Sequence, residues 1–193
     1  MTQGRSTRSV KLLLDPGHSS TAEGAMSIDK LVGEHEVNLY QADILKNILT
    51  PSFTVDIIDP DRDDLTAIGL NAKNYDAFIS LHCNALNRKQ NYVAVCVASR
   101  YSRPQDPHVK LASKCACAMG KAQGIKTYTG PLFPIGVMSS NLMVLNAAHK
   151  AGCNIVMLTE AFFIDFHPDE DTIKKACDLA MAALALTLKK EFQ

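Results

Sequence analysis

Three apolar runs of strand length, each ending on a polar residue, constrain the fold of this chain most strongly. They are Val10–Leu14 before Asp15-Pro-Gly-His18, Ala77–Leu81 before His82, and Ile155–Thr159 before Glu160. Short apolar runs bounded by turn residues are typical of strands buried on both faces, as in a parallel sheet covered by helices. The carboxyl ends of parallel strands meet at one edge, where α/β sheets bind ligands. We therefore expect His18, His82 and Glu160 to converge at that edge.

The other segments predict a single α/β domain with a mostly parallel, twisted sheet of about six strands and helices on both faces. The length of 193 residues suits one domain. Further strands are expected at 53–58, 92–98 and Leu142–Leu145. Helices are expected from Glu34 to before Pro51, at 64–74 with a break at Gly69, at 107–122, and after Pro168. Residues 19–33 and 125–141 are expected to form surface loops, residues 1–8 a disordered lead-in, and residues 9–193 the domain.

The charge balance excludes some classes of partner. Lys plus Arg and Asp plus Glu number 20 each, so no strong overall field favours nucleic acid or an anionic membrane. The longest nearly apolar stretch, Leu179–Leu188, is far shorter than the ~20 residues that span a bilayer. The N-terminus is basic but has no apolar segment of the kind found in signal peptides. We expect synthesis in the cytoplasm without a signal peptide, and no membrane insertion.

The six cysteines do not form the pattern of a secreted disulfide framework. Cys83, Cys96, Cys153 and Cys177 sit inside apolar runs, where a thiol behaves as a small hydrophobic group. Cys115 and Cys117 lie two positions apart in a helical pattern, so they point to different faces. We expect all six to be reduced packing residues, and a metal or redox role for the Cys115–Cys117 pair has little support.

His18, Glu34 and His82 form a candidate metal site. Two imidazoles and one carboxylate are the ligands of several catalytic zinc sites, whose fourth position is left for water. Each residue also has an ordinary explanation: His18 as a turn residue, and Glu34 as a favourable charge at a helix start, with His35 and Glu36 as rivals. A histidine or glutamate on a buried strand, such as His82 or Glu160, needs a partner. The shared sheet edge favours the metal site.

Four motifs occur in a fixed order along the chain. They are Asp15-Pro-Gly-His18, Glu34 four residues before Asn38-Leu39, Ile79-Ser-Leu-His-Cys-Asn-Ala85, and Leu158-Thr-Glu-Ala-Phe-Phe-Ile164. With this set the chain resembles the zinc-dependent N-acetylmuramoyl-L-alanine amidases of the type 3 class, which are cell-wall hydrolases of bacteria and phage endolysins. The resemblance covers nearly all of residues 10–190. It implies that residues 9–193 are an amidase catalytic domain.

The resemblance also implies a mechanism. One catalytic Zn²⁺ per chain would be held by His18, Glu34 and His82, and Glu160 would be the essential glutamate, acting on the water proton or stabilising the intermediate. The substrate would be the amide between the lactyl group of N-acetylmuramic acid and L-alanine in peptidoglycan. Asn71 also matches a family position, and Asn84 is a candidate substrate contact or simply a turn residue. We expect a monomer without nucleic-acid partners that acts on the cell wall after release by lysis, as an endolysin does.

The chain departs from the family pattern outside the metal set. It has Ser19-Ser20 in place of Gly-Gly, no arginine near Thr66, no glycine before the strand at Tyr92, and Asn154 in place of a proline. These differences bear on the subfamily of the chain and on the shapes of its loops rather than on the expected reaction. Two alternatives remain open at this point: a zinc peptidase or carboxypeptidase that cleaves another amide, and a cell-wall-binding module without catalytic activity.

Overall fold

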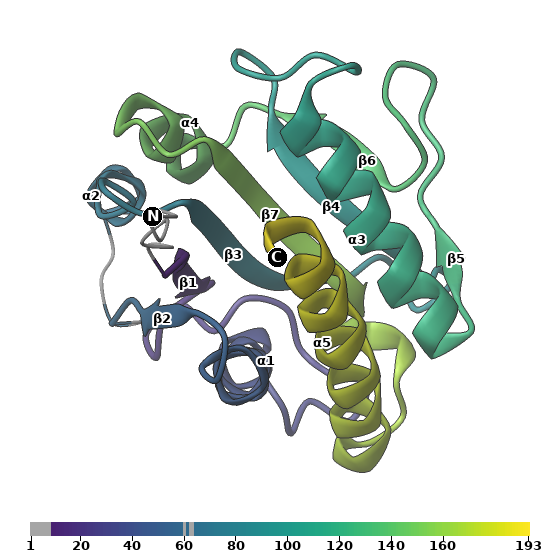
Figure 1. Cartoon of the computed structure of the whole chain (residues 1–193). Helices are drawn as coiled ribbons and strands as arrows, with labels where there is room; N and C mark the ends of the chain where they lie inside the picture. Colours follow the sequence, from purple (N-terminus) through teal and green to yellow (C-terminus); the bar gives the residue numbers. More distant parts are fainter. Residues whose placement is uncertain (1–8, 60, 62–63) are drawn as a thin grey trace, which may run out of the picture.

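A seven-stranded mixed sheet forms the centre of the computed structural model, which describes residues 9–59, 61 and 64–193 (Figure 1). The predicted lead-in at 1–8 lies outside these residues. The strand order is β2-β1-β3-β7-β4-β5, and β6 also pairs with β4. The strands are β1 (Lys11–Pro16), β2 (Thr54–Ile57), β3 (Ala77–Asn84), β4 (Tyr92–Ala98), β5 (Lys126–Thr127), β6 (Val137–Ser140) and β7 (Ile155–Phe163).

Within the described residues, five α-helices cover both faces of the sheet, which confirms the predicted α/β architecture (Figure 1). They are α1 (Glu34–Leu49), α2 (Leu65–Leu70), α3 (Pro107–Gln123), α4 (Met143–Lys150) and α5 (Glu170–Phe192), with a short 3₁₀ turn at Ile164–Phe166. Helices α1, α3 and α5 lie on one face, and α2 and α4 lie on the other. Among the described residues, no helix is both long and apolar enough to cross a membrane.

The central strands are apolar on both sides because each face contributes to a core. In β1, Leu12 and Leu14 pack into the core beneath α1, α3 and α5, while Leu13 packs with α2 and α4. In β3, Ile79 and Phe78 divide between the two cores in the same way. This two-sided burial explains why the strands read as continuous apolar runs rather than as alternating ones.

The strand pairing brings the polar ends of the runs to one edge. Strands β2, β1, β3 and β7 run parallel to one another, and β4 runs antiparallel to β7. The register of β3 with β7 begins at Ala77 opposite Ile155 and reaches His82 opposite Glu160. Side chains of directly opposed residues share one face of a sheet. The predicted convergence of His82 and Glu160 is therefore confirmed, but the predicted strand ends are wrong, because β3 continues to Asn84 and β7 to Phe163.

The strand predicted at Leu142–Leu145 is wrong, because these residues begin helix α4. An apolar run of four residues has no period of its own, so the run alone cannot distinguish a strand from a buried helix segment. The residues that follow place Val144, Leu145, Ala147 and Ala148 on one buried helical face. The segment 125–141, predicted as a loop, contains the short strands β5 and β6, and both pair with β4.

Helix α2 is shorter than predicted and is not broken at Gly69. It spans Leu65–Leu70 and is capped by the preceding Asp64, whose side chain accepts hydrogen bonds from the backbone N–H groups of Thr66 and Ala67. Gly69 lies inside the helix at its contact with α4. A Cβ atom at this position would come 2.3 Å from the carbonyl oxygen of Val144, so the close approach of the two helices requires glycine.

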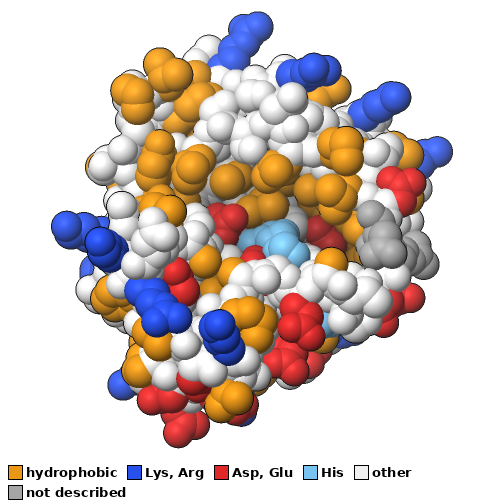
Figure 2. Space-filling view, turned by 180° about the vertical axis from the view of Figure 1, so that it is seen from behind, with side chains coloured by type: hydrophobic (Ala, Val, Ile, Leu, Met, Phe, Trp, Pro, Cys, Tyr) orange, Lys and Arg blue, Asp and Glu red, His pale blue; other side chains and the backbone are white. Residues whose placement is uncertain are grey.

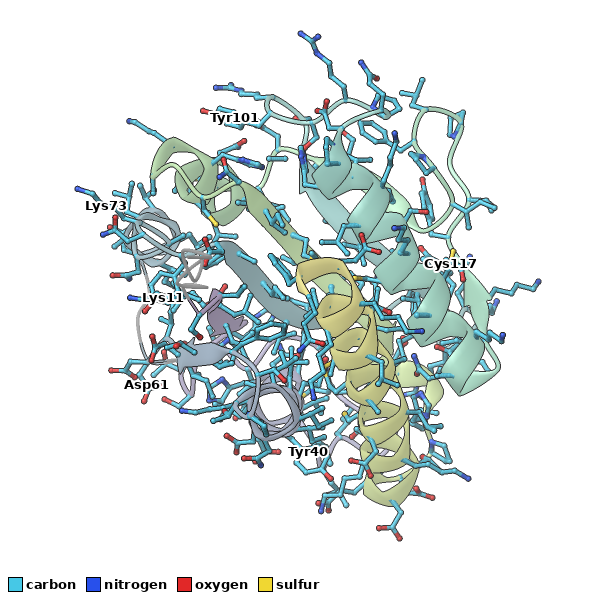
Figure 3. The ribbon with its side chains drawn as sticks, viewed as in Figure 1. Lys11, Tyr40, Asp61, Lys73, Tyr101 and Cys117 are labelled. Carbon is cyan, nitrogen blue, oxygen red and sulfur yellow. The ribbon has the colours of Figure 1, made fainter. Side chains whose placement is uncertain are left out.

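All six cysteines are free in the structure, as predicted. Five are buried, and burial raises the pKa of each of their thiols. Cys117 alone among the six is exposed and projects outward from α3 (Figure 3), so the prediction that it is a packing residue is wrong. Cys115 is buried, as predicted.

We therefore expect one fast-reacting thiol in the native protein and six after denaturation without reductant, because only a thiolate that solvent can reach reacts quickly. A timed titration with a thiol-specific dye measures both numbers. Cys117→Ser should remove the fast phase and leave the other five thiols unchanged. Fewer than six thiols in the denatured protein would reveal a native disulfide and contradict the expectation.

Candidate active site

His18, Glu34 and His82 meet at the carboxyl edge of the sheet. His18 lies in the turn after β1, Glu34 is the first residue of α1, and His82 lies near the end of β3. His18 Nε2 is 3.1 Å from Glu34 Oε2, and His82 Nδ1 is 3.0 Å from Glu34 Oε1. The three residues offer donor atoms that all lie within 4.8 Å of one another. The structure thus brings together the predicted ligand set.

Backbone groups fix the carboxylate of Glu34 between the two histidines. Ala25 donates its N–H to Oε2 at 3.0 Å, and Cys83 donates its N–H to Oε1 at 3.1 Å. Burial by itself would raise the pKa of Glu34, but the contacts with His18 and His82 outweigh it and hold the pKa far below its usual value. Glu34 is therefore an oriented, ionised carboxylate.

The charge on His82 depends on the same contact. Burial by itself would lower its pKa, but the hydrogen bond with Glu34 raises the pKa above its usual value. A metal ion needs the imidazole in its neutral form, so metal binding would compete with the protonated form of His82 that Glu34 favours.

Two glycines leave the space that the cluster occupies. A Cβ atom on Gly17 would lie 2.1 Å from Cε1 and Nε2 of His82. A Cβ atom on Gly24 would lie 2.7 Å from Glu34 Oε2, and Gly24 also has a left-handed φ of 78°. Sequence reasoning missed both residues, although Gly17 stands directly before His18. The cluster therefore requires glycine at both positions, because a side chain at either one would collide with His82 or Glu34.

Gly17→Ala is expected to weaken metal binding at the cluster by at least about 10-fold, because the methyl group would displace the His82 ring. A competition titration against a chromophoric chelator measures the affinity. Gly33→Ala is the matched control, since its Cβ would meet nothing closer than 3.4 Å and its φ is −90°. Equal metal affinity of Gly17→Ala and the wild type would show that His82, with its ring placed as in the structure, is not a metal ligand.

A buried amide network ties the His18 turn to helix α1. Asn38, one helical turn after Glu34, donates from Nδ2 to the carbonyl oxygen of Gly17 at 3.1 Å. Gln41, on the same helix, donates from Nε2 to Cys83 Sγ at 3.1 Å. Both amide side chains are fully buried. The network links three of the four segments that carry the site.

Glu160 differs from Glu34 in its surroundings. Its Oε2 atom is buried and has no hydrogen-bond partner among the described residues. Burial raises the pKa of Glu160 to about 7, even though the nearby His82 acts in the opposite direction. The two glutamates at this edge therefore have pKa values shifted in opposite directions, which is typical of carboxylates with different roles.

The remaining candidates take peripheral positions. Asn84 Oδ1 accepts the backbone N–H of Ala85 at 2.8 Å, as a turn residue does, and its contact with substrate stays a prediction. Of the rivals to Glu34, Glu36 is exposed and His35 is absent from the ligand cluster. Asp15, which sequence reasoning did not single out, is buried beside the cluster and accepts a hydrogen bond from Ser80 Oγ at 2.6 Å.

An apolar cavity of about 330 Å³ opens beside the two histidines. Its wall includes Leu65 and Ile68 of α2, and Leu142 and Met143 at the start of α4. Figure 2 shows the histidines at the bottom of a hollow, with a band of hydrophobic side chains along one side and Asp or Glu side chains close by. A substrate with an apolar part on one side of its reacting bond fits this arrangement.

Residues 12–188 match the model of the N-acetylmuramoyl-L-alanine amidase family. The chain belongs to this family. It is accordingly a peptidoglycan amidase, an enzyme that hydrolyses the amide between N-acetylmuramic acid and L-alanine. No curated protein matches the sequence.

Solved structures share the fold of this amidase. The amidase Ami1 from Mycobacterium abscessus is 16% identical with a TM-score of 0.76, covering 95% of this chain and 99% of its own. An N-acetylmuramoyl-L-alanine amidase from Clostridium difficile 630 is 19% identical with a TM-score of 0.72, covering 94% and 96%. The catalytic domain of the CD27L endolysin, which targets Clostridium difficile, is 21% identical with a TM-score of 0.68, covering 92% and 97%.

Proposed function

We propose that this amidase hydrolyses its substrate at a single zinc ion held by His18, Glu34 and His82, with Glu160 as the proton-transfer group. The observation that carries the proposal is the cluster of two imidazoles and one carboxylate with donor atoms within 4.8 Å, beside a cavity. Two histidines and one glutamate are a zinc ligand set that keeps the fourth position open. A bound zinc ion would polarise the amide carbonyl and lower the pKa of water.

The side chains of the site have separate tasks in this proposal. Glu34 is fixed by the N–H groups of Ala25 and Cys83, so it serves as a rigid ligand. Glu160 Oε2 is buried and has no hydrogen-bond partner among the described residues, so this oxygen is free to take up and release a proton. It would take a proton from the attacking water and return one to the leaving amine of L-alanine.

Product analysis tests the reaction directly. Digested peptidoglycan should contain stem peptides with a free N-terminal alanine and no new reducing sugar ends, as mass spectrometry and amine labelling would show. New peptide ends elsewhere in the stem would indicate a zinc peptidase instead. Binding of cell walls without any release of amines would indicate a non-catalytic module.

We also propose that residues 9–193 act as a monomeric catalytic domain in cell lysis, and that Asn84 contacts the substrate. The fold shared with an endolysin catalytic domain supports the lytic role. One structural neighbour, the CwlD amidase, was solved in complex with the GerS lipoprotein, so partner binding is the competing arrangement. Light scattering should give a mass near 21.0 kDa for the monomer.

The raised pKa of Glu160 also predicts a change in stability with pH for the metal-free protein. A carboxyl group whose pKa is 4.5 when exposed and about 7 when folded favours the folded state below pH 4.5 and disfavours it as the pH rises to 7. Glu160→Gln should therefore be more stable than the wild type at pH 8, by up to about 3 kcal/mol, and this difference should vanish near pH 4.

Urea unfolding of the metal-free proteins at pH 4 and pH 8 measures this difference. The exposed Glu36 gives the matched control, because Glu36→Gln should show no such dependence on pH. A stability difference between Glu160→Gln and the wild type that is the same at both pH values would contradict the raised pKa.

A further inference from the structure

The apolar cavity beside the histidines contains a carboxylate that the proposed mechanism does not use. Asp15 lines this cavity together with His18 and His82. It is the only carboxylate among the described residues that form the wall, and most of the others are apolar. Asp15 is 5% exposed, so its side chain is almost completely shielded from bulk water. A carboxylate in such surroundings is costly unless hydrogen-bond donors reach it.

The sheet register places Asp15 on the same face as the strand residues of the site. Asp15 on β1 lies opposite Ser80 on β3, and His82 follows Ser80 by two positions. Residues two apart on a strand point to the same face, and directly opposed residues share a face. Leu13, two positions before Asp15, packs beneath α2 and α4. Asp15, His82 and its opposite residue Glu160 therefore all lie on the α2–α4 side, where the cavity opens.

Asp15 receives few hydrogen bonds for a buried carboxylate. Ser80 Oγ donates to Asp15 Oδ2 at 2.6 Å, and within the described part of the chain this is the one hydrogen bond to the Asp15 side chain. An ionised carboxylate has about four acceptor positions on its two oxygens. Ser80 thus fixes the orientation of the carboxylate and leaves acceptor positions free on a residue that lines the cavity. A ligand in the cavity can donate to them.

We propose that Asp15 is a substrate-binding residue, which accepts a hydrogen bond from an N–H or O–H group close to the reacting amide. The inference rests on the proposed function, because that function places the reacting bond at His18, Glu34 and His82. Both sides of the bond carry such donors: hydroxyl and acetamido groups on the sugar, and amide N–H groups on the peptide. A hydrogen bond to an ionised acceptor is about twice as strong as one between neutral groups. In a mostly apolar cavity, one such contact fixes the orientation of the substrate.

A link between β1 and β3 is the ordinary role of a buried Asp–Ser pair. These strands are already paired through their backbones, from Leu12 opposite Ala77 to Pro16 opposite Leu81. A neutral pair of side chains would join them without the cost of burying a charge. The two roles also differ in their consequences. Loss of a structural link lowers the stability of the protein, whereas loss of a substrate contact raises KM in the folded enzyme.

The test is Asp15→Asn, assayed on a muramoyl peptide at zinc concentrations that saturate each protein. The amide oxygen of asparagine can accept the Ser80 hydroxyl, which leaves the amide nitrogen, a donor, to face the donor of the substrate. We expect KM to rise about 10–100-fold with little change in kcat, because the contact exists before and during the reaction. Ser80→Ala keeps the carboxylate, so it should lower the stability and raise KM less.

Asp56→Asn is the matched control. The Asp56 carboxylate also accepts a hydrogen bond from a hydroxyl group, that of Tyr75 at 2.8 Å, but it is exposed and does not line this cavity. Asp56→Asn should therefore keep the KM of the wild type. An unchanged KM in Asp15→Asn would overturn the inference, as would an equal rise of KM in Ser80→Ala or Asp56→Asn.

Binding of the two products to the metal-free protein, followed by NMR, shows which side of the substrate carries the donor. Asp15→Asn should bind the N-acetylmuramic acid product more weakly than the wild type does if the donor lies on the sugar, and the alanyl peptide more weakly if it lies on the peptide. Equal affinities of the two proteins for both products would overturn the inference. If the wild type does not cleave the muramoyl peptide, the proposed function fails, and this comparison still decides the role of Asp15.

Crystals of the wild-type protein with each product decide the inference if Asp15→Asn does not fold. An N–H or O–H group of one product within hydrogen-bond distance of the Asp15 carboxylate is the expected result. Products bound beside the histidines without any contact to Asp15 would overturn the assignment.

Discussion

Glu160→Gln is expected to lower kcat by about 10²–10⁴-fold, the usual contribution of a general acid–base group, while one zinc ion per chain stays bound. The reason lies in the position of Glu160 on β7, directly opposite His82 but outside the set of three ligand atoms. Its Oε2 atom is buried without a hydrogen-bond partner among the described residues, so it is free to carry the proton. Glutamine keeps the shape of the side chain but cannot carry the proton.

Steady-state kinetics on a muramoyl peptide and metal analysis of the same preparation measure both quantities. Glu36→Gln, at an exposed position on α1, should retain both the activity and the zinc. A Glu160→Gln protein that loses its zinc, or that keeps the full kcat, would contradict the assigned role. A larger loss of kcat would indicate that Glu160 also stabilises the charged intermediate.

Glu34→Ala is expected to abolish zinc binding and activity together. The carboxylate lies between both histidines, 3.1 Å from His18 Nε2 and 3.0 Å from His82 Nδ1, so its removal leaves two imidazoles without their common partner. It also leaves the N–H groups of Ala25 and Cys83 without their acceptor. Two histidines alone are one ligand short of the three that catalytic zinc sites use.

Titration with zinc under conditions that saturate the wild type measures the loss, and circular dichroism verifies the fold. The comparison with Glu160→Ala separates the two glutamates. If Glu34→Ala retains metal and turnover while Glu160→Ala loses its zinc, then the roles of the two residues are reversed.

The central strands were predictable from sequence because burial on both faces leaves a continuous apolar run, although β3 and β7 continue past the polar residue that ends each run. His82 and Glu160 end such runs, and the parallel register of β3 and β7 places them opposite each other. The sequence alone did not distinguish Glu34 from the neighbouring candidate ligands His35 and Glu36, because all three follow a long loop at the start of a helix. Only the folded loop, through the hydrogen bond from Ala25, shows which of the three faces the histidines.

Other features of the site have no local signal in the sequence. The requirement for glycine at positions 17 and 24 arises from His82 and Glu34, which approach from other segments. The apolar run Leu142–Leu145 forms a helix because the residues after it complete a buried helical face.

Anomalous scattering at the zinc absorption edge, recorded from crystals of the zinc-loaded protein, tests the central claim most directly. The account predicts one strong peak per chain, within bonding distance of His18, Glu34 and His82, with Glu160 outside the ligand sphere. A peak at another site, or a zinc ion bound by Glu160 with Glu34 turned away, would contradict the account.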